Sequence, residues 1–234
     1  MVHTYSILYF TGSSVASWVL SKDQEWMPWY LGGHGAIENS FVDMPFYATD
    51  PGVMHFGYAV FGFHLEQLLS HLLAKKRGGD FAEMLLHDSV TCFLYFGYIC
   101  SNLVPIGTII IFLHDITDIP FHISKFANST KNIAVAGVFF VVGQLGWIWF
   151  RLVALPLIIY SLYTQANYGA ARSTFDIFIG LNSAFLSMLL LMHIFWFTMF
   201  QRINIKLFRG AWKAGENDQP SAQCQAAAVQ GSDS

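Results

Sequence analysis

The strongest constraint on this fold is a series of apolar stretches, each close to the length that crosses a lipid bilayer. A membrane-spanning helix needs roughly 20 mostly apolar residues, and six segments of the 234-residue chain approach that length. Only 12% of the residues are charged, whereas an average soluble domain carries about 25%. The sequence therefore predicts an all-α integral membrane bundle of about six transmembrane helices.

The expected helices are separated by short polar, glycine-rich or proline-containing turns. They cover residues 5–21, 52–74, 83–103, 105–127, 133–154 and 176–205, with a partial helix between 155 and 175. Gly12 and the two serines after it are expected to interrupt the first helix. Pro120 is expected to kink the fourth helix, and Pro156 to end the fifth.

One transmembrane domain is expected over residues 5–210. It follows a short N-terminal end at 1–4, and it precedes a polar tail at 211–234 whose composition is typical of disorder. With six spans, both chain ends and the turns at 75–82 and 128–132 share one side, which holds nine of the twelve Lys and Arg residues. Cytosolic loops carry an excess of Lys and Arg, so this basic side is expected to be cytosolic or its organellar equivalent.

Two neighbouring helices carry ionisable side chains within their apolar sequence, where a charge is costly and is therefore a functional candidate. At about 100° per residue, the polar groups of the helix at 83–103 fall within an arc of about 140°. They are Glu83, His87, Asp88, Thr91, Tyr95, Tyr98 and Asn102. A second arc of about 100° on the helix at 105–127 holds His114, Asp115, Asp118, His122 and Lys125. Because a short turn joins these helices, we expect the two polar faces to meet and to satisfy each other.

The cluster has two interpretations. Membrane helices use polar groups to hold one another together, but a hydroxyl and an amide would be enough for that purpose. Several His and Asp residues at similar depth instead favour catalysis or ligand binding. His87 and Asp118 are predicted to face each other across a cavity that opens to the basic side, where a substrate with a polar head and a fatty tail would approach.

Other polar residues are weaker candidates. His64, Glu66 and His71 on the second helix could line the same cavity, but because they do not all share one face, we expect contacts with a partner protein or a lipid. His193 is expected either to pack through hydrogen bonds or to bind a ligand. Arg151 is expected to reach the membrane surface, with an anionic head group as its alternative partner.

Residues 87–128 carry a motif that resembles the signature of the ceramide synthases, within the wider TLC membrane family. The matching positions are His87, Thr91, Asn102, Gly107, His114, Asp115, Asp118, Lys125 and Asn128. Three positions depart from that signature: Asp88 replaces the second His of a His pair, Pro105 replaces an Arg, and His122 replaces a Glu.

The resemblance implies transfer of a fatty acyl group from acyl-CoA to the amine of a sphingoid base, with no cofactor and no metal. An imidazole such as that of His87 can act as base or nucleophile, and a carboxylate can orient it. The catalytic candidates are His87, Asp88, His114, Asp115 and Asp118. The substrate-binding candidates are Thr91, Asn102, His122, Lys125, Arg151 and His193.

The altered His pair leaves a second interpretation open. The chain would then be a catalytically inactive TLC-family protein that acts as a lipid-binding or structural subunit of a larger membrane complex. Membrane lipids are the expected partners in either case, together with a membrane protein or a second copy of the chain. Nucleic acid is not expected, because the net charge is only −3. The endoplasmic reticulum is the expected location, with a mitochondrial or other organellar membrane as the alternative.

Overall fold

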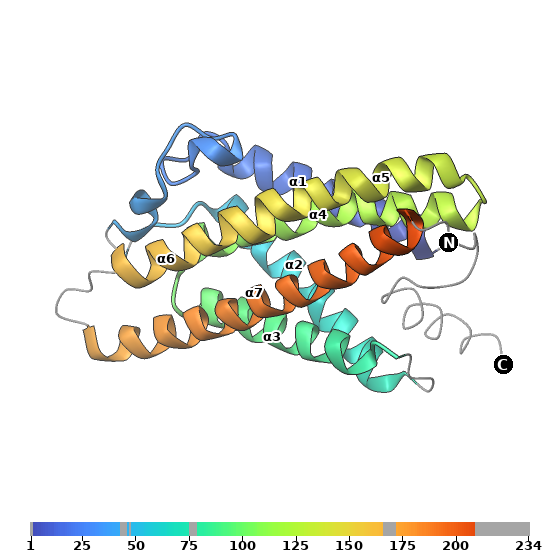
Figure 1. Ribbon diagram of the computed structural model, residues 1–234. Coiled ribbons are helices and arrows are strands. Elements are labelled where there is room, and N and C mark those ends of the chain that lie inside the picture. The colour runs from blue at the N-terminus through green and yellow to red at the C-terminus, as the bar shows by residue number, and fades with distance from the viewer. Residues whose placement is uncertain (1, 43–45, 47, 75–78, 166–171, 209–234) are drawn as a thin grey trace.

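Six long helical segments make up the computed structural model, which describes residues 2–42, 46, 48–74, 79–165 and 172–208 (Figure 1). They are α1 (Val2–Ser21), α2 (Pro51–Leu73), α3 (Phe81–Cys100), α4 (Val104–Ser129), a continuous segment of α5 (Ile133–Gly146), η3 (Trp147–Ala154) and α6 (Leu155–Gln165), and α7 (Arg172–Phe208). Two short 3-10 helices, η1 (Trp29–Leu31) and η2 (Ile37–Phe41), lie between α1 and α2. The expected count of six long helices is confirmed.

Three of these segments are both long enough and apolar enough to cross a membrane. They are Val104–Ser129, Ile133–Thr164 and Ile177–Ile205. The helices α1, α2 and α3 have 20, 23 and 20 residues, a length that permits crossing. Six membrane crossings therefore remain a prediction.

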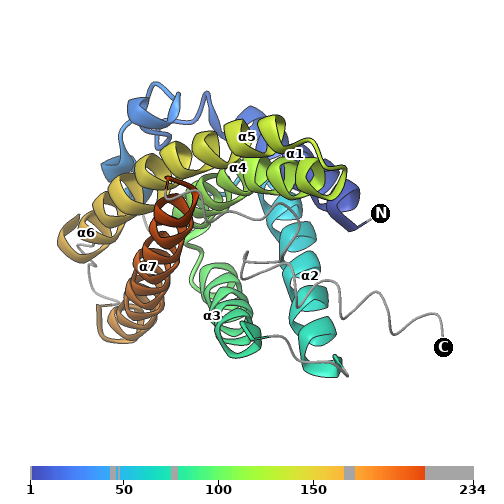
Figure 2. The ribbon, with the colours of Figure 1, turned by 45° about the vertical axis from the view of Figure 1, so that its right-hand side comes forward.

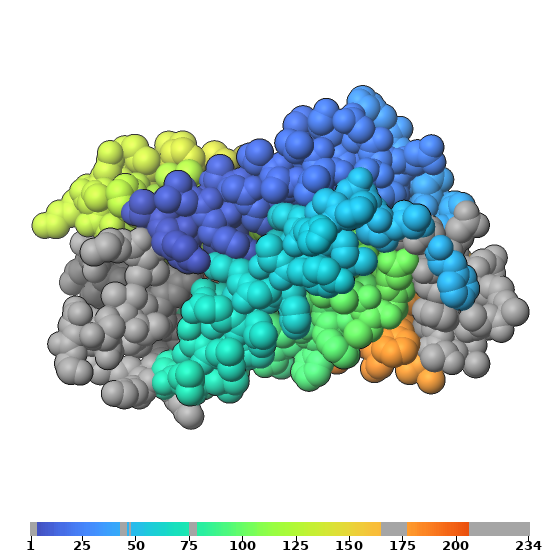
Figure 3. All heavy atoms as spheres, turned by 180° about the vertical axis from the view of Figure 1, so that it is seen from behind, coloured from blue at the N-terminus to red at the C-terminus, as the bar shows by residue number. Residues whose placement is uncertain are grey.

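The helices form two layers. In one layer α4 lies between α1 and α5, and in the other α3 packs between α2 and α7 (Figures 1 and 2). The layers meet where α2 packs on α1 and where α7 packs on α6 and η3. Seen from behind, α1 and α2 cover much of the surface (Figure 3). The consecutive helices α3 and α4 thus belong to different layers.

A tight contact between the layers is built on two glycines. The Tyr98 side chain of α3 lies against Gly57 of α2 and Gly107 of α4, and a Cβ at either glycine would come within 1.7 or 2.7 Å of it. Small residues let membrane helices approach each other closely. The tyrosine, 4% exposed, therefore ties three helices together beside the cavity described below.

Two expected interruptions are absent from the helices. The helix α1 runs unbroken through Gly12, and the serines after it are buried. The fifth helix does not end at Pro156 but continues to Gln165. A proline ring in a helix clashes with the carbonyl four residues earlier, which here belongs to Leu152 in the π-helical stretch η3. The wider turn of a π-helix relieves that clash, so the chain remains helical.

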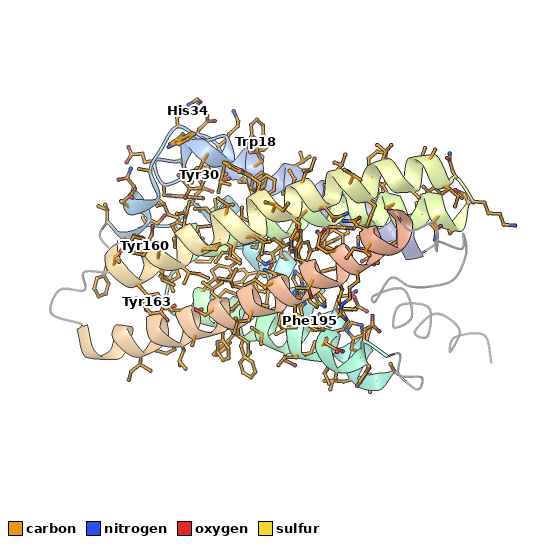
Figure 4. The ribbon with its side chains drawn as sticks, viewed as in Figure 1. Trp18, Tyr30, His34, Tyr160, Tyr163 and Phe195 are labelled. Atoms are coloured by element: carbon orange, nitrogen blue, oxygen red, sulfur yellow. The ribbon has the colours of Figure 1, made fainter. Side chains whose placement is uncertain are left out.

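The two ends of the bundle differ. The beginning of α1, the end of α2, the beginning of α3 and the α4–α5 connection lie at the same end (Figure 1), which agrees with the predicted topology. Tyr30, Tyr160 and Tyr163 lie towards the other end (Figure 4), and the last two are 66% and 61% exposed, as is typical of membrane interfaces. Which end is cytosolic remains a prediction, and residues 75–78 and 209–234, the polar tail included, lie outside the described residues.

Candidate functional site

A cavity of about 230 Å³ lies between the two layers. All six helical segments contribute to its lining. Nine of the eleven site residues expected from the sequence are among the lining residues: His87, Asp88, Thr91, His114, Asp115, Asp118, His122, Lys125 and Arg151. His87 and Asp118 therefore line one cavity, as their faces predicted, although the chemical role of each remains a prediction.

The lining changes character along the bundle. Asp118, His122 and Lys125 line the cavity towards the basic end of α4, whereas Ile106 and Ile110 line it in the first turns of the same helix. On ideal geometry about 28 Å of helix separates Ile106 from Lys125. The apolar half is completed by other aliphatic side chains: Leu103, Ile111, Leu162, Leu186 and Leu189. This change from a polar to an apolar lining suits a molecule with a polar head and a long apolar tail.

One wall of the cavity is a chain of two imidazoles and a carboxylate. The carboxylate of Asp88 contacts Nδ1 of His71 through one oxygen, and its other oxygen lies 3.3 Å from Nδ1 of His87. His71 comes from the last turn of α2, and the other two residues come from α3. The side chains of His71 and Asp88 are each 8% exposed, and that of His87 is 18% exposed. Of these three residues, His87 thus has the most exposed side chain.

Two histidines of α2 line the cavity. His64 stacks on Tyr95 with ring centroids 4.9 Å apart, and both side chains line the cavity together with His71. Of the two alternatives, the structure supports cavity lining for His64 and His71, and contacts of this helix with a partner remain a prediction. Glu66 is exposed and accepts hydrogen bonds from Gln67 and Ser70 of its own helix. The seven-residue spacing of the two histidines, two helical turns, was the signal that puts them on one face.

The opposite wall is organised by Arg151. Its guanidinium donates to Asp118 Oδ1 at 2.6 Å, to Thr117 Oγ1 at 2.7 Å and to His193 Nε2 at 3.3 Å. The arginine side chain is 3% exposed, so the expectation that it reaches the membrane surface was wrong. The π-helical stretch η3, which contains Arg151, changes the angular spacing of its residues, and the sequence pattern did not reveal it.

The same wall presents an unoccupied imidazole nitrogen. His114 Nδ1 lies 2.7 Å from the carbonyl of Ile110, and because a carbonyl only accepts, this nitrogen carries the proton. His114 Nε2 then bears the lone pair of a neutral ring, and it has no hydrogen-bond partner among the described residues. The neighbouring carboxylate of Asp115 is buried and accepts a hydrogen bond from Ser13 of α1.

The three aspartates on the polar faces of α3 and α4 do not pair between these two helices, contrary to expectation. Asp88 pairs with α2, Asp115 with α1, and Asp118 with η3. The reason is architectural, because α3 and α4 lie in different layers and the cavity separates their polar faces. Each carboxylate therefore takes its partner from another helix.

Two site candidates lie outside the cavity lining. Asn102 is in the turn after α3 with φ 52°, a left-handed conformation that asparagine tolerates, and it accepts a hydrogen bond from Thr49 at 3.0 Å. His193 is fully buried, and its backbone carbonyl accepts from Trp147 Nε1 at 3.2 Å. This geometry supports a turn role for the first and a packing role for the second. Among the described residues no group of three His, Cys, Asp or Glu side chains is arranged to hold a metal ion.

Comparison with known proteins decides the family. Residues 1–202 match the TLC domain. This chain belongs to the TLC family. It is 27% identical over 207 residues to ASC1-like protein 3 of Oryza sativa subsp. japonica, covering 87% of this chain and 71% of that protein. It is 27% identical over 161 residues to ceramide synthase LOH2 of Arabidopsis thaliana, and 28% identical over 200 residues to ceramide synthase 5 of Homo sapiens.

The relatives are longer than the matched region. The alignments cover 67% of this chain and 54% of the Arabidopsis protein, and 84% of this chain and 48% of the human protein. The chain thus spans about half the length of these two ceramide synthases. Family membership, together with the three long apolar helices, indicates a membrane protein that is similar to ceramide synthases.

Proposed function

We propose that this TLC-family chain is an N-acyltransferase that moves a fatty acyl group from acyl-CoA to the amine of a sphingoid base. One observation carries the proposal. At the polar end of an amphipathic cavity, His87 has its Nδ1 beside the carboxylate of Asp88. Against an ionised carboxylate the proton resides on Nδ1, which leaves Nε2 as a base. Similarity to proteins named ceramide synthases supports the same reaction.

The cavity lining suggests how the two substrates would bind. The acyl tail and the sphingoid chain would occupy the apolar half, lined by residues such as Leu186 and Leu189. The thioester and the amine would then lie near His87 and His114, whose Nε2 is without a described partner. Lys125 lines the polar half, and a basic rim attracts the phosphates of CoA.

The proposed reaction uses this chain's own groups at each proton transfer. The amine nitrogen attacks the thioester carbonyl carbon while His87 Nε2 accepts the proton that the amine loses. The Thr91 hydroxyl, one helical turn from His87 and without a described hydrogen-bond partner, would donate to the oxyanion. Collapse of the intermediate breaks the carbon–sulfur bond, and the departing thiolate takes the proton from His87. The products are an N-acyl sphingoid base and free CoA.

A second function has one observation in its favour. Asp88 stands where ceramide synthases carry the second histidine of a pair, so a family member without turnover would keep the fold and bind a lipid in the same cavity. That protein would act as a lipid-binding or structural subunit of a membrane complex. The endoplasmic reticulum is the proposed location for either function.

Acyl transfer in nanodiscs tests the proposal. The purified chain is supplied with a sphingoid base and acyl-CoAs of several lengths, and parent is compared with His87→Ala. The variant is expected to lose about 100-fold or more of the rate while its thermal unfolding stays close to that of the parent. Incubation with acyl-CoA alone, followed by intact mass measurement, distinguishes a base from a nucleophile that forms an acyl-imidazole.

A folded parent that transfers no acyl group to any sphingoid base would reject the enzyme. Binding of a long-chain lipid by that inactive parent, measured by native mass spectrometry, would then support the subunit function. A lipid-binding subunit should still bind after His87→Ala, because the apolar half of the cavity is unchanged.

A further inference from the structure

The contact between His71 and Asp88 joins two helices at the cavity wall. Asp88 uses one carboxylate oxygen for His71 and the other for His87, so a single carboxylate bridges an imidazole of α2 and an imidazole of α3. The side chains of His71 and Asp88 are each 8% exposed. The bridge is therefore buried, whereas His87 remains partly open.

The bridge determines the orientation of His87. A carboxylate held at one oxygen by a buried donor cannot rotate freely, so its second oxygen keeps its place beside Nδ1 of His87. The described ring contact of His87 is with Trp196, with centroids 5.3 Å apart in a tilted arrangement, and such a contact leaves the choice of protonated nitrogen open. Through Asp88, His71 thus influences which nitrogen of His87 carries the proton.

We propose that His71 is a positioning residue of the acyl-transfer site, which acts through Asp88 to keep the Nε2 lone pair of His87 directed at the substrate. This inference rests on the proposed function. In this chain the carboxylate stands at the position of the second histidine of the ceramide synthase motif, and the second imidazole comes from α2 instead. The imidazole of His71 on α2 would then take the place of the histidine that the altered motif lacks.

Replacing His71 by residues that keep or remove its donor tests the inference. Asparagine places an amide donor close to the position of imidazole Nδ1, whereas leucine fills the space without a donor. His71→Leu is expected to lower kcat about 10- to 100-fold, the usual cost of losing a partner that orients a functional imidazole, with KM changed less than about twofold. His71→Asn is expected to recover most of that loss. His55→Asn, at an exposed position of α2 outside the cavity, is the matched control and should match the parent.

The dependence on Asp88 gives a second test. If His71 acts through Asp88, adding His71→Leu to Asp88→Asn should cause no further loss of kcat, because the pathway is already broken. Fully multiplied losses in the double variant, or equal losses for His71→Leu and His71→Asn, would overturn the inference.

A readout that does not need activity separates this inference from the proposed function. In histidine labelled with ¹⁵N, the His87 signal of the parent is expected to show the proton on Nδ1, and His71→Leu should shift the population towards the other tautomer. An inactive parent would reject acyl transfer. An unchanged His87 signal in His71→Leu would reject the positioning role, whether or not the parent is active.

Discussion

Each of the two walls of the cavity presents a carboxylate, but the two carboxylates have partners of different kinds. On the α2–α3 wall, the partners of Asp88 are His71 and His87, which can gain or lose a proton. On the α4–η3 wall, Asp118 is paired with the guanidinium of Arg151 at 2.6 Å, a group that stays charged in proteins.

This difference in the partners of the two carboxylates predicts different roles for the two walls. The guanidinium also donates to Thr117 and to the carbonyl of His114, so it joins η3 to α4 through several bonds. Removing Arg151 would leave the partly exposed carboxylate of Asp118 without this partner, whereas the imidazoles and the carboxylate of the α2–α3 wall can share a proton. If the proposed acyl transfer is correct, we expect the α2–α3 wall to serve proton transfer and the α4–η3 wall to contribute mainly to stability.

The largest expected effect breaks the α4–η3 wall. Arg151→Met should destabilise the protein by about 3 kcal/mol, the lower end of the cost of breaking a buried ion pair, because Arg151 is buried whereas the Asp118 side chain that loses its partner is 29% exposed. Chemical unfolding in detergent measures the loss. The double variant Arg151→Met/Asp118→Leu removes both charges and should recover most of it. A single variant as stable as the parent would contradict the structural role of this wall.

A smaller effect, of a different kind, is expected on the α2–α3 wall. Asp88→Asn should reduce acyl transfer about 100-fold, which corresponds to about 2.7 kcal/mol in the activation barrier, since an amide no longer favours the proton on His87 Nδ1. Its stability should fall less than that of Arg151→Met, because no permanent charge is stranded. Glu66→Gln, exposed on α2, serves as the control. Loss of stability with unchanged transfer would reverse the assignment of the two walls.

The hydrogen bond between Ser13 of α1 and Asp115 of α4 is expected to have an intermediate effect on stability. Ser13→Ala removes a described hydrogen-bond donor from Asp115, which is 1% exposed, and should cost about 1–3 kcal/mol of stability. Ser14→Ala is the matched control, because the buried Ser14 hydroxyl has no described partner and its loss should be nearly neutral. Equal effects of the two changes would show that the Ser13–Asp115 contact adds nothing.

The smallest expected effect concerns the apolar half that both walls share. Leu186→Phe adds volume at a site that is 1% exposed in the cavity lining, so longer acyl chains should lose buried methylenes at about 0.8 kcal/mol each. Competition between acyl-CoAs of different length should then shift several-fold towards the shorter chain. Leu191→Phe on the same helix, 67% exposed, controls for the added ring. If the preference for acyl-chain length does not change, the acyl tail does not bind beside Leu186.

Several features of the protein follow from local sequence pattern. The long apolar segments predicted six helices because a helix satisfies its own backbone groups in a lipid environment. The period of about 3.6 residues placed His87, Asp88 and Thr91 on one face, and the structure brings that face to the cavity. The similarity of residues 87–128 to the ceramide synthase signature also depended on sequence alone, and the family match agrees with it.

The partner of each of the three aspartates in α3 and α4 was decided by tertiary structure. Asp88 pairs with a residue 17 positions away, Asp118 with one 33 positions away and Asp115 with one 102 positions away. No helical period relates residues on different helices, so a short connection between α3 and α4 suggested the wrong pairing. The π-helical stretch that holds Arg151 was likewise not indicated by the sequence pattern. Sequence determined which residues are polar within the helices, and the packing of two layers around a cavity determined which of them meet.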